Sequence, residues 1–198
     1  MLLCGALVVA AGAVARVGDG ELLAEVAAAT RRTAAGSAAL DVAVRHVELV
    51  HATITASRPE LVAQYAALHR DARAEDNLYT AWLAAANAAR LLLAGGRAAE
   101  ALTWSRAAVR TSVEAGLRDN AYVLEVHGAA LGRAGEAAAA LRVFGAVEAQ
   151  HRGAGVPWPW DESVGALLTA MTARLGRAAA ERAREEGARA TPAELADT

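Results

Sequence analysis

The sequence has no lysine, one cysteine and no concentration of charge of one sign, and each shortage excludes a class of chemistry. All 20 basic residues among the 198 are arginine, which excludes P-loop phosphate binding through lysine, Schiff-base chemistry and a lysine general base. Because Cys4 is alone, it can form neither an internal disulfide nor a CxxC site. The formal net charge is −2, so we predict no direct contact of this segment with nucleic acid.

Alanine is the abundant residue, with 56 copies, whereas proline occurs only four times and aromatic residues make up 4%. Alanine is the best helix former, so the composition predicts an all-α protein. A core built from alanine brings helix backbones close together. Such helices must pack over long, regular surfaces and cannot depend on a few large anchors.

The first fifteen residues, MLLCGALVVAAGAVA, carry no charge, and we expect them to form a buried first helix. The alternative is the apolar part of a secretory signal, although no basic residue precedes the apolar run. A membrane span is a poorer interpretation, because fifteen residues at about 1.5 Å each fall short of a roughly 30 Å hydrocarbon core. We therefore expect a cytoplasmic protein with no membrane contact. Because the helical pattern is already under way at residue 1, the sequence also favours a truncated or misassigned start.

Helical segments separated by short glycine-containing joints recur along the chain. A shift of 39 residues places Gly96 on Gly135 and Leu92 on Leu131. Each unit is predicted to be a helix, a tight turn at the glycine, a second helix and an exit loop. The predicted helices are 82–94 and 98–115 in the first unit, 120–133 and 136–150 in the second, and 38–56 and 59–72 in a further pair. We expect three to four such pairs over residues 1–152.

Five positions of the second unit follow a more specific pattern, namely a small residue, a large apolar residue, a glycine, an alanine and an aromatic residue in this order. They are Gly128, Leu131, Gly135, Ala140 and Phe144. Two antiparallel helices joined by a short turn pack closely only if facing residues are small, which Gly128 and Ala140 provide, while Leu131 and Phe144 fill the space toward the next unit. This pattern resembles the tetratricopeptide repeat.

The first unit fits this repeat less well. Ala89, Leu92, Gly96 and Ala101 agree with it, but Ser105 stands where the aromatic residue belongs. The resemblance implies a right-handed α-solenoid of antiparallel helix pairs with C-terminal capping helices. The repeats would span residues 1–155, and a Pro/Trp loop with capping helices would span 156–198.

Residues 80–195 also resemble the end of the helical region of large ATP-binding LuxR-type and SARP-type transcriptional regulators. The resemblance rests on the order of Phe144–Gly145–Ala146, Pro157 and Pro159, Leu175–Gly176, the helix 178–187, and Thr191–Pro192 with Glu194. The penultimate helix lacks the aromatic residues usual in that family, from which we expect looser docking. The resemblance implies a sensing or protein-contact segment whose nucleotide-binding and DNA-binding modules lie elsewhere.

No pattern of catalytic or metal-ligating residues appears. The histidines at 46, 51, 69, 127 and 151 lack the i,i+3 or i,i+4 spacing of helical metal ligands, so we predict no metal site. His127 takes a normally apolar position of the repeat, and we expect it to be half-buried with a hydrogen-bond partner. Neighbouring carboxylates, such as Glu185 and Glu186, diverge on a helix by about 100° and suit a solvated face. We expect neither an enzyme nor a cofactor.

Two features are candidates for binding. Trp158 and Trp160 in VPWPW form either a ligand platform or, as we prefer, a seal between the last repeat and the C-terminal helices. In repeat arrays the first helix of each pair lines the concave face, where extended peptides bind. The polar residues predicted on that face are Asn87, Arg90, Tyr122 and Glu125. The alternative is that these four residues belong to an ordinary hydrated surface that binds no partner.

These observations predict a protein or peptide partner. The first hypothesis is a regulatory helical-repeat segment of a LuxR/SARP-like ATP-binding regulator, and the second is a stand-alone tetratricopeptide scaffold that holds a peptide in its concave groove.

Overall fold

The computed structural model describes residues 19–34, 38–55, 60–117, 120–153 and 162–198, together with the single positions 11 and 14. Within these ranges the chain forms ten α-helices and no strand, which confirms the all-α prediction. The helices are α2 (Gly20–Ala34), α3 (Ala38–Thr55), α4 (Glu60–Ala74), α5 (Leu78–Ala94), α6 (Ala98–Glu114), α7 (Ala121–Arg133), α8 (Ala137–Gly153), α9 (Glu162–Leu175), α10 (Arg177–Arg189) and α11 (Pro192–Ala196).

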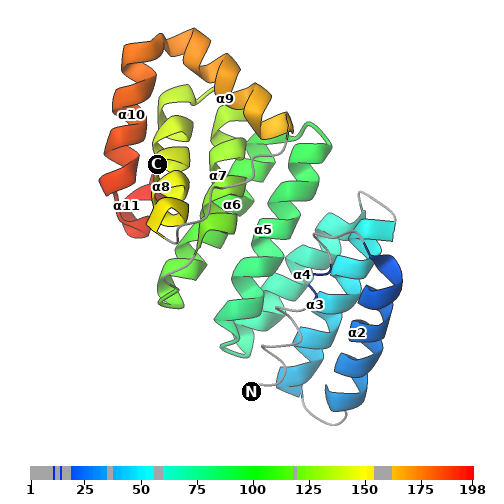
Figure 1. Cartoon of the computed structure of the whole chain (residues 1–198). Coiled ribbons are helices and arrows are strands. Elements are labelled where there is room, and N and C mark those ends of the chain that lie inside the picture. The colour runs from blue at the N-terminus through cyan, green and yellow to red at the C-terminus, as the bar shows by residue number, and fades with distance from the viewer. Residues whose placement is uncertain are drawn as a thin grey trace.

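Consecutive helices pack side by side from α2 to α8 (Figure 1), so the fold consists of neighbouring helix pairs. α4 packs more extensively on α5 than on α3. Alternate helices also meet, because α3 contacts α5, α5 contacts α7, and α7 contacts α9. These odd-numbered helices therefore follow one another in a single row, which brings residues far apart in the sequence onto one side of the molecule.

The short joints between helices share one geometry. Gly96 and Gly135 have φ of 74° and 93°, which confirms the predicted turns at these glycines. Each turn is closed by a main-chain hydrogen bond, Arg97 N to Leu92 O at 2.8 Å in the first and Glu136 N to Leu131 O at 2.9 Å in the second. The α4–α5 joint has the same closing bond, but Asp76 occupies the left-handed position with φ of 53°. Aspartate tolerates this conformation better than most residues, so the turn forms here without a glycine at the left-handed position.

The α7–α8 hairpin closes around a glycine and an aromatic ring. A β-carbon on Gly128 would lie 3.1 Å from Cζ of Phe144. The sequence predicted that Gly128 faces Ala140 and that Phe144 fills the space toward the next unit. The structure corrects this, because the group that lies against Gly128 is the ring of Phe144 from the other helix of the same hairpin. Phe144 and Ala140 are both fully buried, in the largest hydrophobic cluster of the described residues. The missing side chain of Gly128 therefore makes room for the only phenylalanine in the sequence.

α10 docks closely on α8, contrary to the expectation drawn from its lack of aromatic residues. A β-carbon on Gly145 of α8 would overlap the main chain of Arg184, and one on Gly187 of α10 would overlap the main chain of Arg142. Two glycines, one on each helix, thus let the backbones touch, and an aromatic anchor is not needed. The remaining face of α10 is solvated, as predicted, with Glu181, Glu185 and Glu186 exposed.

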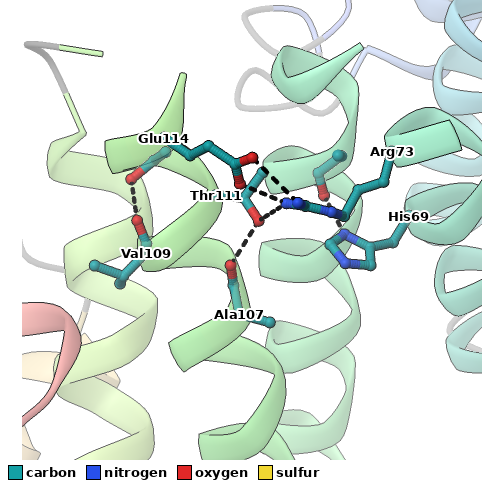
Figure 2. Close-up of polar contacts among 8 residues, drawn as sticks. His69, Arg73, Ala107, Val109, Thr111 and Glu114 are labelled. Carbon is teal, nitrogen blue, oxygen red and sulfur yellow. Dashed lines mark hydrogen bonds and ion pairs between the residues drawn. The ribbon is translucent and has the colours of Figure 1, made fainter. Parts of the chain in front are cut away.

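A set of polar contacts links α4 to α6 (Figure 2). Arg73 donates to Glu114 through both terminal nitrogens, at 2.7 and 3.2 Å, and its Nη1 also lies 3.3 Å from the Thr111 hydroxyl. The hydrogen bond to Arg73 lowers the pKa of Glu114. On the neighbouring turn, Nδ1 of His69 lies 2.8 Å from the Ala81 carbonyl oxygen. These contacts are near the surface, so they fix the relative position of the helices more than they stabilise the fold.

Several predicted features lie outside the described residues. They are the first helix over residues 1–15 except positions 11 and 14, the Pro59 segment before α4, and the VPWPW stretch with Trp158 and Trp160. Among the helices that the structure does describe, none combines the length and the apolar character that crossing a bilayer requires.

Candidate peptide-binding face

The residues predicted to bind a partner lie on two helices that touch each other, α5 and α7. The Tyr122 hydroxyl donates a hydrogen bond of 2.9 Å to Oδ1 of Asn87, so the structure joins these two residues directly. Asn87 is 7% exposed and Tyr122 is half-buried. Because Tyr122 occupies Oδ1 of Asn87, the remaining polar atom of the Asn87 amide is the donor Nδ2.

Arg90 lies one helical turn beyond Asn87 on α5. Its side chain is exposed and forms no ion pair with any residue that the structure describes. Nine ion pairs join other charged side chains of the described ranges, all of them arginine to glutamate or aspartate. Arg90 is thus an exposed cation, and a carboxylate is the group that its planar fork binds best.

Glu125 lies one turn beyond Tyr122 on α7. It is half-buried and has an interaction partner of its own within the chain. The four predicted residues are thus brought onto the same pair of helices, but they do not all have the same role. Arg90 is exposed, Asn87 and Tyr122 are hydrogen-bonded to each other, and Glu125 interacts with another group of the chain.

An aromatic row borders this face. The ring of Trp82 lies 5.7 Å from that of Tyr79, edge to face, and 6.3 Å from that of Tyr122. Trp82 is only 6% exposed and is a packing residue, and its indole nitrogen has no hydrogen-bond partner among the described residues. Tyr79 and Tyr122 are partly buried against the same core. The face therefore combines rigid aromatic carbon with polar groups at its edge, a combination typical of protein-binding surfaces.

Tyr65 of α4 was not predicted to belong to this region. It is fully buried and shares a hydrogen bond of 3.2 Å with the Thr53 hydroxyl. Burial raises the pKa of Tyr65 to about 12, while the Thr53 hydrogen bond and the positive charge of Arg90 act in the opposite direction.

His127 forms a buried pair with Ser105. The histidine is fully buried, not half-buried as predicted, and its Nδ1 lies 2.9 Å from the Ser105 hydroxyl, which supplies the predicted partner. Burial lowers the pKa of His127 to about 4, the charge of Arg106 adds to this effect, and the Leu195 main chain opposes it. A serine and a histidine at this distance resemble a catalytic pair, but here both side chains are fully buried.

A further group of charged residues lines an open cleft of about 380 Å³ between α3 and α4. Arg45 stands between two carboxylates there, 2.9 Å from Asp71 and 3.4 Å from Asp41. Within the described residues no three histidine, cysteine or acidic side chains converge in a way that would hold a metal ion. The cleft therefore consists of a paired arginine among carboxylates.

Comparison with models of known families, with curated proteins and with solved structures finds no significant match for this chain. Inference about its function therefore depends on its own residues.

Proposed function

We propose that this chain is a helical-repeat protein-interaction segment that holds an extended peptide along α5 and α7. The observation that carries the proposal is Arg90, an exposed arginine that has no ion pair with any described residue and lies one turn beyond the Asn87–Tyr122 hydrogen bond, on a face with aromatic residues. Such a face offers a carboxylate site, an amide donor and a rigid ring within a short distance. These are the groups that recognise a peptide with an acidic residue or a free C-terminus.

The repeat architecture is part of the same proposal. Four helices, α4, α5, α6 and α7, end in one turn geometry, the third of them at Gly116 with a bond of 3.1 Å from Leu117 N to Ser112 O. This regularity supports a right-handed solenoid of tetratricopeptide-like hairpins. The contacts of α3, α5, α7 and α9 in sequence support it as well, since alternate helices of a solenoid line one surface. In this arrangement α5 and α7 are the first helices of adjacent hairpins.

The resemblance of residues 80–195 to LuxR-type and SARP-type regulators supports a cytoplasmic regulatory role. The segment would transmit the binding of a partner to nucleotide-binding and DNA-binding modules, and would not itself contact nucleic acid. The reading frame upstream of Met1 tests this part of the proposal. An in-frame nucleotide-binding module supports the regulator, whereas an independent ribosome-binding site supports the stand-alone scaffold.

Selection of peptides with free C-termini from a random display library against the full chain tests the binding face. We expect selected peptides to carry an acidic residue or to depend on their terminal carboxylate, and Arg90→Ala to weaken their binding at least tenfold. Arg32→Ala is the matched control, because Arg32 is also exposed and has no ion pair with a described residue, but lies on α2. Equal loss in both variants, or no loss in either, contradicts the proposed site.

Tyr122→Phe separates the two parts of the face. This change keeps the ring and removes only the hydroxyl that donates to Asn87. We expect a smaller loss of affinity than for Arg90→Ala, because Asn87 loses an internal partner but the aromatic surface remains. A loss as large as that of Arg90→Ala would mean that the hydrogen-bonded pair, and not the arginine, dominates recognition.

A further inference from the structure

A second site lies on α6, where the chain binds its own final segment. α11 packs on α6, and Leu195 is its fully buried anchor, with Ala196 beside it at 5% exposure. Nε and Nη2 of Arg106 both donate to the main-chain oxygen of Thr198, at 3.2 and 2.9 Å. Arg110, one turn further along α6, pairs with Asp197 at 3.0 Å. In Figure 1 this segment, drawn in red, turns back from the end of α10.

The groove under this segment is basic, and the segment is acidic. Arg106 and Arg110 of α6 bind its final residues, and the charge of Arg142 from α8 acts on Glu194. The segment itself carries Glu194 and Asp197 and no basic residue. Opposite charges therefore meet at the end of the segment, where Arg110 pairs with Asp197, as in recognition of a ligand by complementary charge.

Few groups hold α11 on α6, although their polar contacts are specific. α11 has five residues, and a capping box between Thr191 and Glu194 fixes its N-terminus, with bonds of 2.7 Å from Thr191 N to Glu194 Oε2 and 3.3 Å from Glu194 N to Thr191 Oγ1. Only Leu195 serves as a large buried anchor, and the Arg110–Asp197 pair is exposed at 64% and 77% of its two side chains. Exposed ion pairs of this kind stabilise little. By contrast, α10, which precedes it, is held on α8 by backbone contact at two glycines.

From these contacts we propose that residues 191–198 occupy an exchangeable peptide site on α6, and that a partner protein binds there by displacing them with an acidic, N-capped helical turn carrying one leucine. The resident segment shows the chemistry of the ligand: a threonine or serine cap, a leucine for the apolar floor, and carboxylates for Arg106 and Arg110. This site is separate from the α5–α7 face and does not depend on the function proposed for it.

Binding of a labelled copy of the segment to the full chain tests the proposal. The probe is the nine-residue peptide ATPAELADT, residues 190–198, with fluorescein at its N-terminus. In Leu195→Asp the resident segment loses its anchor, and we expect this variant to bind the probe at least tenfold more tightly than the parent chain by fluorescence anisotropy. Leu22→Asp is the matched control, because Leu22 is 44% exposed on α2, and we expect it to bind as the parent does.

The added substitutions Arg106→Ala and Arg110→Ala should reduce binding of the probe to Leu195→Asp at least tenfold. A probe in which alanine replaces its leucine should not bind. The proposal is overturned if Leu195→Asp stays helical and binds the probe no better than Leu22→Asp does. It is also overturned if Leu195→Asp and the parent chain form a heterodimer, because a second copy of this chain would then be the occupant.

Hydrogen exchange of the unmodified chain provides a test that needs no variant. The amide of Leu195 donates to Thr191 O in the first turn of α11, and the amide of Ala180 donates to Gly176 O in the first turn of α10. We expect the Leu195 amide to exchange at least 100-fold faster than the Ala180 amide, because the segment opens separately from the rest. Equal rates would show that the segment opens only with α10 and would overturn the proposal.

Discussion

The hairpins α5–α6 and α7–α8 have the same turn but fill equivalent positions with different chemistry. In α7–α8 the ring of Phe144 lies against Gly128. The corresponding position of α5–α6 is Ser105, whose hydroxyl contacts His127 of the next hairpin. One hairpin is therefore closed by an apolar contact within itself, and the other by a polar contact with its neighbour.

This difference accounts for both departures from the repeat pattern. Ser105 stands in place of an aromatic residue, and His127 stands at a normally apolar position, 22 residues later. Either one alone would be a defect, because a small polar residue leaves space and a buried histidine needs a partner. Together they fill one site between α6 and α7. Two departures from a repeat pattern can thus indicate a contact between neighbouring units.

The largest effect that we predict is for Phe144→Ala. Removing a fully buried phenylalanine leaves a cavity, and we expect the free energy of unfolding to fall by about 4 kcal/mol, measured by urea denaturation. Ser105→Ala is the matched control, because it removes one hydroxyl at the equivalent position and should cost about 1 kcal/mol. Equal losses in the two variants would show that the two positions are not filled in different ways.

The second prediction is a pH dependence caused by His127. Its pKa is about 4 in the folded chain, against about 6.5 for an exposed histidine, so the unfolded chain binds the proton more readily. The stability that this residue contributes is therefore complete above pH 6.5 and is lost as the pH falls through 4, to a total of about 3 kcal/mol. His127→Leu should remove this part of the loss when urea unfolding is compared at pH 7 and pH 4.

His46 contributes a similar loss of stability in acid, since burial also lowers its pKa to about 4, and its contribution must be measured separately from that of His127. His46→Leu should reduce the acid loss by a similar amount, and the double variant should reduce it further. The carboxylates with lowered pKa, such as Glu114, are common to all these proteins and cancel in the comparison. An acid loss in His127→Leu as large as that of the parent chain would contradict the assignment.

Much of the fold could be predicted because helix formation is a local property. Alanine content predicted helices, and Gly96 and Gly135 marked two turns because their left-handed conformations favour glycine. The equivalent turn at Asp76 was missed, since aspartate has other uses and its identity does not specify a turn. Likewise, nothing in the order of residues showed that Gly145 and Gly187 face the backbones of distant residues.

The candidate site could be predicted from the sequence to the same extent as the fold. Helical spacing placed Asn87 and Arg90 one turn apart on α5, and the register of the repeat placed Tyr122 on the adjacent helix. The hydrogen bond between Asn87 and Tyr122, the burial of Tyr65 and the absence of an ion pair at Arg90 within the described residues depend on how α4, α5 and α7 cross. Crossing geometry results from packing of the whole chain, which sequence spacing does not specify.

The smallest effect that we predict distinguishes a crowded glycine from an open one. Glycine to alanine in a helix normally stabilises by about 0.5–1 kcal/mol, and we expect this gain for Gly165→Ala in α9, where no neighbouring atom lies within 4 Å of the new carbon. At Gly128 the new carbon would lie 3.1 Å from a fully buried ring that has no room to move, so overpacking outweighs the gain and the net loss is about 1 kcal/mol.

A double variant locates the cause of that loss. Phe144→Leu removes the ring atoms that crowd Gly128, so Gly128→Ala should become neutral or stabilising in the Phe144→Leu background, as measured by the change in urea midpoint at constant slope. If Gly128→Ala stabilises the parent chain as much as Gly165→Ala does, the hairpin α7–α8 is not closed by contact of this ring with its glycine. The distinction between the two hairpins would then rest on Ser105 and His127 alone.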